Sequence, residues 1–259
     1  MAKKPFNTVI IKLGSSTLTT PQGKLDLKNL KRIANESAKL VKQGKRVLIV
    51  SSGAIAAGAE KLKLGKPSTI PEKQAAAAVG QSLLMRQYEK AFEKHKISVA
   101  QILLTKEEIQ NSERAANTRN CIFTLLNEKV VPIINENDTV AVDEIKIGDN
   151  DNLAALTAKL IGADILVILT DVDGFYMQDE NGKEQVVPTI EKISQEVKNA
   201  AGGTLSHHGT GGMTTKIQAA EICSGAGIYT SIINGRKNGA LERVLSGAGI
   251  GTLFTPPNN

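Results

Sequence analysis

Two clusters of short polar side chains stand in the middle of the chain. An apolar run over residues 130–134 leads directly into the first cluster, residues 135–138, and the second covers residues 148–152. Asn and Asp are common in ordinary loops because they form turns and cap helices. These roles do not account for two such clusters on either side of one apolar segment. Because open α/β sheets bind ligands at the carboxyl ends of their strands, this spacing favours a binding or catalytic role.

A lysine beside small residues follows the first apolar run of the chain. Residues 8–11 predict a short buried strand, and Lys12, Gly14 and two serines come after it. A lysine there can reach a phosphate, glycine lets the backbone approach a ligand, and serine supplies hydroxyl donors. A surface lysine before a turn explains the same pattern. The motif by itself leaves both interpretations open.

Two further segments place small residues at the start of a helix. In VSSGA, residues 50–54, a strand passes into a helix whose free N–H groups attract anions. In GTGGMTTK, residues 209–216, Lys216 lies in the first turn, so backbone amides, the helix dipole and one ammonium can hold phosphates. The segment is not a Walker A loop, because Thr215 stands where that motif has glycine.

Two acidic residues and two histidines allow several interpretations. Asp171 and Asp173 follow an apolar run and precede Gly174, so they can contact a nucleotide, bind a metal or form the turn. Two carboxylates without further ligands do not make a metal cage, which favours the nucleotide. His207 and His208 are adjacent and cannot adopt the helical i,i+4 geometry of zinc ligands, which favours an exposed loop.

Composition limits the class of protein. The 259 residues include 41% hydrophobic and 22% charged side chains, which is typical of a soluble globular protein. The net charge of +6 suits anionic partners, but the basic residues are spread over amphipathic stretches and aromatics are only 3%, which argues against nucleic acid. Two distant cysteines and the lack of any run of about 18 apolar residues predict a cytoplasmic protein, neither secreted nor membrane-embedded.

Strands and helices alternate along the whole chain. Asp26 is a candidate N-cap and Gly44 a candidate stop for one helix. Gly80 lies inside a long Ala-rich helix, where it costs about 1 kcal/mol relative to Ala, so we expect close helix packing at that residue. The pattern predicts one α/β domain over residues 1–259 with a largely parallel sheet. Helices are expected over 26–43, 71–95, 113–129 and 150–161, and strands over 47–50, 99–104, 164–169, 228–235 and 251–254.

Taken together, six segments resemble the amino acid kinase superfamily. They are KLGSS, VSSGAIAAG, INEND, IKIGDNDNL, LTDVDGFY and GTGGMTTK, in order from Lys12 to about Phe254. The INEND and GDNDN pair resembles most specifically the members that phosphorylate the γ-carboxylate of L-glutamate with ATP, the first step of proline biosynthesis. The resemblance implies a three-layer αβα sandwich around a mainly parallel central sheet.

The resemblance also implies roles for individual residues. Lys12 and Lys216 are expected to neutralise phosphoryl oxygens and Asp149 to hold their ammonium groups in place, and these three form the catalytic set. No protein metal ligand is expected, because Mg²⁺ would be bound mainly through the nucleotide phosphates. The expected ATP-binding residues are Lys12, Gly14, Thr170, Asp171, Thr210, Gly211, Gly212, Met213, Thr214, Thr215 and Lys216. The expected substrate-binding residues are Ser52, Gly53, Asn137, Asp138, Lys146 and Asn150.

The chemistry of this transfer agrees with that set of residues. Phosphoryl transfer depends on positioning and charge stabilisation. A carboxylate acceptor is already ionised at neutral pH, so it needs no general base, and Asp149 is interpreted as an organiser. A free α-ammonium group needs an anionic partner when it is desolvated. Asp138 is the candidate, and it would not suit an N-acetylated amine.

Partners and alternatives complete the expectations. Many members of the family continue into a C-terminal PUA domain, whereas this chain is expected to lack one because it stops at Asn259. The resemblance implies a homo-oligomer, a dimer or tetramer, and feedback inhibition by proline. One alternative is a sibling kinase acting on another carboxylate or on a nucleoside monophosphate. The other is a non-catalytic regulator that binds nucleotides or nucleic acid.

Overall fold

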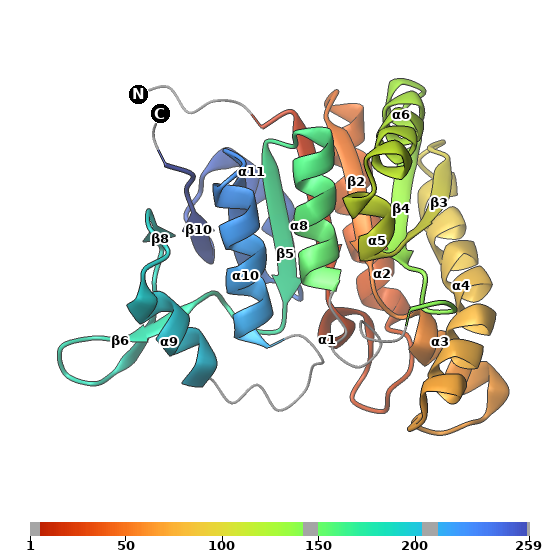
Figure 1. Cartoon of the computed structure of the whole chain (residues 1–259), viewed down its shortest axis with the longest axis horizontal. Coiled ribbons are helices and arrows are strands. Elements are labelled where there is room, and N and C mark those ends of the chain that lie inside the picture. The colour runs from red at the N-terminus through yellow and green to blue at the C-terminus, as the bar shows by residue number, and fades with distance from the viewer. Residues whose placement is uncertain (1–5, 142–149, 204–211, 258–259) are drawn as a thin grey trace.

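A sheet of eight strands forms the centre of the computed structural model, which describes residues 6–141, 150–203 and 212–257 (Figure 1). The strand order is β3-β4-β2-β1-β5-β9-β10-β8, and only the β9–β10 pair is antiparallel. The mainly parallel sheet expected from the sequence is confirmed. Its strands are β1 Thr8–Leu13, β2 Arg46–Ser51, β3 Val99–Leu104, β4 Val131–Glu136, β5 Ile165–Thr170, β8 Thr189–Ile190, β9 Tyr229–Asn234 and β10 Thr252–Phe254.

Helices cover both faces of this sheet. Successive residues of a strand point to opposite faces. In β1, Ile10 therefore joins the apolar cluster under α8 and α10, while Val9 and Ile11 join the cluster on the side of α2 and α4. This is the expected three-layer αβα arrangement. The helices are α1 Ser15–Leu18, α2 Leu27–Lys42, α3 Ala54–Leu62, α4 Ile70–Glu93, α5 Lys106–Gln110, α6 Ser112–Asn127, α8 Asn150–Ile161, α9 Gln195–Gly203, α10 Met213–Ser224 and α11 Ala240–Ser246.

The ends of α2 follow from local chemistry. The Asp26 carboxylate accepts a hydrogen bond from the backbone N–H of Asn29 at 3.0 Å, which satisfies one of the free donors of the first turn. The helix ends at Lys42, and Gly44 adopts φ +82°, a conformation that glycine reaches without steric cost. Both predicted boundaries are confirmed.

Two glycines allow α3 and α4 to cross at close range. A Cβ atom on Gly80 would lie 1.7 Å from the carbonyl oxygen of Ala54, and one on Gly58 would lie 1.7 Å from that of Ala76. Both approaches are far shorter than van der Waals contact, so only hydrogen fits there. The packing reason expected for Gly80 is confirmed. Because α3 begins at Ala54, this crossing also fixes the turn between β2 and α3.

The polar ends of several parallel strands meet at one edge of the sheet. β1 lies between β2 and β5, with Leu13 opposite Ser51 and Lys12 opposite Ile168. The strand order runs from β1 through β2 and β4 on one side, and β5 and β9 follow on the other side. The loops that leave β1 and β5 therefore diverge. Such a switch point leaves a crevice at the carboxyl ends of the strands, which is where open α/β sheets bind ligands.

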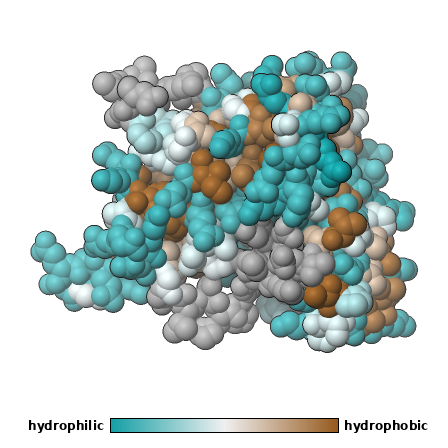
Figure 2. All heavy atoms as spheres, viewed as in Figure 1, coloured by the Kyte–Doolittle hydropathy of each residue, from teal (hydrophilic) through white to brown (hydrophobic). Residues whose placement is uncertain are grey.

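Away from that edge the molecule has an ordinary surface. Hydrophilic residues predominate on the face seen in Figure 2, and hydrophobic residues occur there in separate groups. A hairpin of β6 Tyr176–Gln178 and β7 Glu184–Val186 projects from one side of the fold (Figure 1). Within the described residues no helix combines the length and apolar character needed to cross a bilayer.

Candidate active site at the carboxyl edge of the sheet

Lys12 lies near the end of β1 with its side chain buried. Strand alternation puts it on the same face as Ile10, under α8 and α10, and only 4% of the residue is exposed. Its Nζ atom lies 2.6 Å from Oδ1 of Asp151, in the first turn of α8. Burial with an ionic partner rules out the interpretation of Lys12 as a surface lysine before a turn.

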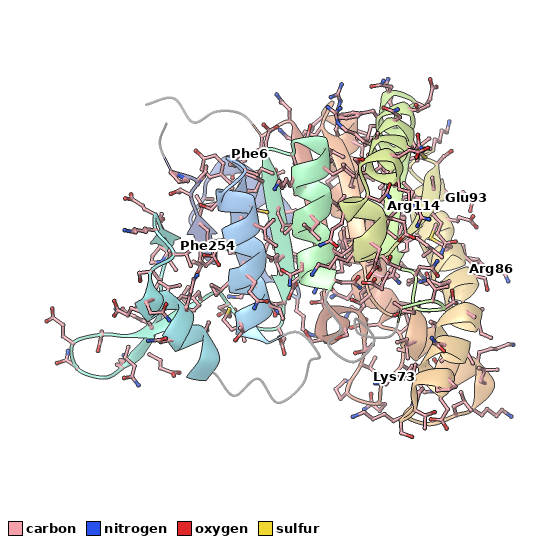
Figure 3. The ribbon with its side chains drawn as sticks, in the orientation of Figure 1. Phe6, Lys73, Arg86, Glu93, Arg114 and Phe254 are labelled. Atoms are coloured by element: carbon pink, nitrogen blue, oxygen red, sulfur yellow. The ribbon has the colours of Figure 1, made fainter. Side chains whose placement is uncertain are left out.

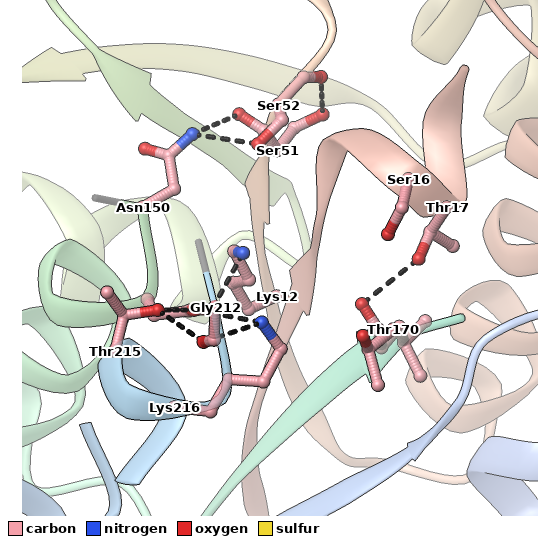
Figure 4. Close-up of polar contacts among 12 residues, drawn as sticks. Lys12, Ser16, Thr17, Ser51, Ser52, Asn150, Thr170, Gly212, Thr215 and Lys216 are labelled. Atoms are coloured by element: carbon pink, nitrogen blue, oxygen red, sulfur yellow. Dashed lines mark hydrogen bonds and ion pairs between the residues drawn. The ribbon is translucent and has the colours of Figure 1, made fainter. Parts of the chain in front are cut away.

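Asp151 joins three side chains from two other elements, β1 and α10. Lys216, in the first turn of α10, places Nζ 3.3 Å from Oδ2 of Asp151, while Lys12 occupies Oδ1. The hydroxyl of Thr215 lies 2.7 Å from the same Oδ2 atom. Figure 4 shows Lys12 and Lys216 approaching one another from β1 and α10. One carboxylate thus holds two ammonium groups at the carboxyl edge of the sheet.

The electrostatics of this cluster follow from burial and opposite charges. Burial alone would raise the pKa of Asp151, but the ammonium groups of Lys12 and Lys216 outweigh it and lower that pKa to about 2. For Lys216, burial and the nearby Lys12 lower the pKa, while Asp151 opposes them. Two cations and one anion leave a net positive charge at the crevice. This charge favours an anionic ligand.

The structure adds a residue to the predicted set. Asp151, two residues after the predicted Asp149, contacts both lysines. Helix periodicity carried the signal, because residue 151 shares one face of α8 with the buried Ala154, Ala155 and Ala158. Asp149 itself and the predicted Lys146 lie outside the described residues.

Two glycines flank the lysine cluster. A Cβ atom on Gly14 would lie 3.4 Å from the carbonyl oxygen of Leu169 and 3.6 Å from Nζ of Lys12, so a side chain there would occupy the space above the ammonium. Gly212 precedes α10 and supplies no side-chain cap, which leaves the first N–H groups of that helix to an outside acceptor. Both glycines therefore leave room for a ligand beside the lysines.

Three of the predicted ATP-binding residues lie in α10, and their side chains make different contacts. Met213 is buried in the apolar core, and the hydroxyl of Thr214 donates to the carbonyl oxygen of Ala201 at 3.3 Å. The side chain of Thr215 instead contacts Asp151. A phosphate can therefore meet the backbone amides of Met213 and Thr214 but not their side chains. The predicted Thr210 and Gly211 lie outside the described residues.

The end of β5 is tied to the loop after β1. Oδ1 of Asp171 accepts hydrogen bonds from the hydroxyls of Thr170, at 3.0 Å, and Ser16, at 3.3 Å. Thr17 strengthens the connection by donating to the carbonyl oxygen of Leu169 at 3.1 Å (Figure 4). Sequence reasoning missed Ser16 and Thr17 as partners, because nothing in the sequence shows that β1 and β5 are neighbours.

Asp173 is engaged in contacts with the chain after β9. Its Oδ1 atom lies 2.8 Å from Nδ2 of Asn234 and 2.9 Å from Nζ of Lys237. The hydrogen bonds from Lys237 and Asn234 lower the pKa of Asp173. Within residues 6–141, 150–203 and 212–257, no three His, Cys, Asp or Glu side chains gather in a way that could hold a metal. The predicted loop at His207 and His208 lies outside these ranges.

A second cluster, of amide and hydroxyl groups, surrounds Asn150. The Nδ2 atom of Asn150 lies 3.0 Å from Oγ of Ser52, 3.0 Å from Oδ1 of Asn135 and 3.3 Å from the carbonyl oxygen of Ser51. Its Oδ1 atom is buried and has no hydrogen-bond partner in the described part of the chain. Gly53 turns the chain here with φ +103°. Asn135 was not predicted as a site residue, although it belongs to the first polar cluster of the sequence, residues 135–138.

The loop after β4 contributes two of the predicted residues. Asn137 stabilises the turn, since its Oδ1 accepts from the Thr139 hydroxyl at 2.6 Å and its N–H donates to the carbonyl oxygen of Leu104. Asp138 is half-buried, and desolvation raises its pKa to about 6. Among the described residues it has no hydrogen-bond or ion-pair partner. A desolvated carboxylate without a partner is suited to receive a cation from a ligand.

Comparisons with known proteins agree with this geometry. The model of the amino acid kinase family matches residues 7–234. A glutamate 5-kinase of Clostridium acetobutylicum is 48% identical over 255 residues, covering 97% of this chain and 96% of that protein. One of Pelobacter propionicus is 47% identical over 256 residues, covering 98% of this chain and 69% of that protein. The crystal structure of UMP kinase from Bacillus anthracis has a TM-score of 0.62 with 16% identity, covering 98% of both chains, which shows the fold alone.

Proposed function

The chain belongs to the amino acid kinase family, and we propose that it transfers the γ-phosphoryl group of ATP to the γ-carboxylate of L-glutamate. The products are L-glutamyl 5-phosphate and ADP, and the reaction is the first step of proline biosynthesis. The single observation that carries this proposal is the buried Lys12–Asp151–Lys216 cluster at the switch point of the sheet. The relatives named glutamate 5-kinase support the choice of acceptor.

ATP is proposed to bind over the lysine cluster. Lys12 and Lys216 would contact its phosphate oxygens, with Gly14 and Gly212 leaving the space that the phosphates need. Thr170 and Asp171, with the loop from Thr210 to Lys216, would bind the rest of the nucleotide. Mg²⁺ would be held mainly by the nucleotide phosphates, where it supplies further positive charge. The lysine cluster, with two ammonium groups and one carboxylate, fits this role in binding phosphates.

Glutamate is proposed to bind between the β2–α3 turn and the loop after β4. Ser52 and Gly53 would hold its carboxylate oxygens through hydroxyl and backbone donors, and Oδ1 of Asn150 would accept a hydrogen bond from its α-ammonium group. Asp138 would pair with the α-ammonium group, which relieves the cost of a desolvated carboxylate. Asn137 would shape the loop, and Lys146 would lie near the transferred phosphate.

The transfer requires charge neutralisation more than proton transfer. A γ-carboxylate oxygen attacks phosphorus, the bond between the γ-phosphorus and the bridging oxygen breaks, and ADP leaves with the electron pair. No proton moves, because the acceptor is already ionised. Lys12 and Lys216 stabilise the charge that the transition state spreads over the phosphoryl oxygens, and Asp151 holds both ammonium groups in place.

The proposal is tested by trapping the acyl phosphate. The purified protein is incubated with MgATP, hydroxylamine and L-glutamate, with N-acetylglutamate, aspartate and UMP in parallel, and both ADP and hydroxamate are measured. We expect hydroxamate with glutamate alone. ADP release with another acceptor would identify a sibling kinase. Absence of turnover, with retention on heparin or RNA at moderate salt, would instead support a non-catalytic regulator.

Replacing Lys216 by Met should separate turnover from stability. Met keeps the unbranched apolar part of the side chain but removes the ammonium, so we expect kcat to fall about 10²-fold, with a much smaller change in thermal stability. The matched control is Lys198→Met, which removes an exposed ammonium 2.6 Å from Glu221 and should leave kcat unchanged. An unaltered kcat in Lys216→Met would remove this residue from the mechanism.

Glutamate affinity should depend on pH through Asp138. With a pKa of about 6, this carboxylate is mostly ionised at pH 7 and mostly protonated at pH 5. The dissociation constant for glutamate, measured by calorimetry without ATP, should therefore rise about tenfold between these values. Asp138→Asn should bind glutamate weakly at both pH values. A wild-type affinity that does not change with pH would contradict this assignment.

The same carboxylate should reduce the stability of the ligand-free fold. Its folded pKa lies above the ordinary value of 3.8, so the folded state binds the proton more tightly, and stability falls as pH rises from about 4 to 6. Asp138→Asn should thus unfold at a higher temperature than wild type above pH 6 and at the same temperature near pH 4. Thermal unfolding at the two pH values measures this difference.

The remaining features are proposals from the family resemblance. We propose that residues 1–259 form one amino acid kinase domain and that the enzyme acts in the cytoplasm, where ATP and free glutamate occur. We also propose a homo-oligomer that is inhibited by proline. Mass measurement in solution and glutamate kinetics with added proline test these two properties.

A further inference from the structure

One stripe of α4 faces the proposed glutamate site. Gln74, Gln81 and Tyr88 are spaced seven residues apart, which keeps them on nearly the same side of a helix. Each contacts a segment that carries proposed substrate-binding residues. The opposite side of α4 carries charged residues such as Arg86 and Glu93, which lie at the outer edge of the molecule in Figure 3. The stripe thus places polar groups on the side of α4 that packs on the core.

Tyr88 acts on the β2–α3 turn through one serine. The tyrosine is fully buried, and its hydroxyl lies 2.7 Å from Oγ of Ser51. Oγ of Ser51 in turn lies 2.9 Å from the carbonyl oxygen of Ser52. A serine hydroxyl has a single hydrogen, which Ser51 donates to that carbonyl, so Tyr88 must be the donor to Ser51. Burial raises the pKa of Tyr88 well above its usual value, which keeps that donor protonated.

This relay fixes the peptide that follows Ser52. In a trans peptide the carbonyl oxygen and the next N–H point in opposite directions. With the Ser52 carbonyl held towards Ser51, the N–H of Gly53 points the other way. The Asn150 side chain contacts the same turn from its other side, at Oγ of Ser52 and the carbonyl oxygen of Ser51. The orientation of the turn is thus fixed from two sides, by α4 and by α8.

Gln81 and Gln74 act on the loop after β4. Nε2 of Gln81 donates to the carbonyl oxygen of Glu136 at 3.4 Å, and Oε1 of Gln81 accepts from Gln101 of β3 at 3.1 Å. Seven residues earlier in α4, Nε2 of Gln74 donates to the carbonyl oxygen of Ala141 at 3.4 Å. These two bonds hold the start and the end of the segment that contains Asp138.

We propose that Tyr88 and Gln81 are positioning residues that set the affinity for the acceptor carboxylate substrate without contacting it. This inference rests on the proposed function. The hydrogen bonds of the α4 stripe go to the β2–α3 turn, the loop after β4 and β3, whereas the lysine cluster lies on β1, α8 and α10. Loss of a stripe hydrogen bond should therefore alter glutamate binding and leave ATP binding almost unchanged.

The test is a steady-state comparison of single and double variants. Tyr88→Phe removes one hydroxyl and keeps the ring, and we expect KM for glutamate to rise about fivefold, with KM for ATP unchanged. Ser51→Ala should give a similar rise. If Tyr88 acts through Ser51, the double variant should be no worse than either single one, because both break the same relay. A role in stability alone would not produce this non-additivity.

A matched control and a second variant keep the test decisive. Tyr229→Phe removes a hydroxyl from the amino end of β9 and should leave both KM values unchanged. Gln81→Met keeps the side-chain length, removes the bond to Glu136, and should raise KM for glutamate alone. Unchanged glutamate KM in Tyr88→Phe and Gln81→Met, with an active wild type, would overturn this inference only. A wild type that turns over no glutamate would overturn the proposed function itself.

Discussion

Asp151→Asn is expected to lower kcat about 10³-fold, the largest effect on activity predicted for any single substitution here. Asn has nearly the same shape and can still meet the hydroxyl of Thr215, but it cannot balance two buried ammonium groups. Lys12 and Lys216 are 4% and 6% exposed, so water does not replace the lost carboxylate. One of the two lysines should then lose its proton or move away, and the transition state loses part of its stabilisation.

The same substitution should destabilise the fold in a way that depends on pH. Breaking a buried ion pair by removing one partner costs about 3–5 kcal/mol. The pKa of Asp151 is lowered to about 2, so its stabilising contribution is present above about pH 4 and is lost as pH falls through 2. The difference in unfolding free energy between wild type and Asp151→Asn should thus be large at pH 7 and shrink towards pH 2.

The measurements are single-turnover kinetics and denaturant unfolding. Glu221→Gln, which neutralises a carboxylate in an exposed ion pair with Lys198, is the control and should leave kcat and stability almost unchanged. Asp149→Asn, made in parallel, tests the residue to which the sequence assigned the organising role. A kcat within tenfold of wild type in Asp151→Asn would refute that role for Asp151.

Gly80→Ala is expected to lower stability strongly by disturbing the crossing of α3 and α4. Alanine normally favours a helix over glycine by about 1 kcal/mol. Here the added methyl group would lie 1.7 Å from the carbonyl oxygen of Ala54, and a backbone atom cannot move aside without shifting α3. We expect a net loss of about 3 kcal/mol and a fall in melting temperature of roughly 10 °C. Because α3 begins at Ala54, KM for glutamate should rise as well.

Gly202→Ala provides the control for helix propensity. Gly202 lies in α9, and a Cβ atom there would meet none of the described residues within 4 Å. The substitution should leave the melting temperature unchanged or slightly raised, because no contact opposes the better propensity of alanine. Equal effects of the two substitutions would show that the α3–α4 crossing does not limit stability.

The sequence by itself determined the order of the elements and the chemistry available to the site. Short apolar runs indicated the parallel strands, and Asp26 and Gly44 marked the ends of α2, because these signals act over a few residues. Lys12 and Lys216 were recognised because glycine beside lysine at a strand end or helix start suits a phosphate. The close packing at Gly80 was also readable, since an interior glycine in a helix has a cost that must be offset.

Tertiary structure decided which side chains meet. The sequence does not distinguish Asp151 from the other polar residues of its cluster, and the packing of α8 on the sheet places it against Lys12 and Lys216. Ser16 reaches Asp171, and Tyr88 reaches Ser51, across separations of 155 and 37 residues. Such pairs depend on strand order and helix packing, and both of these arise from burial of the whole core. No local pattern encodes them, which is why a sequence names the reactive groups more readily than the partners that hold them.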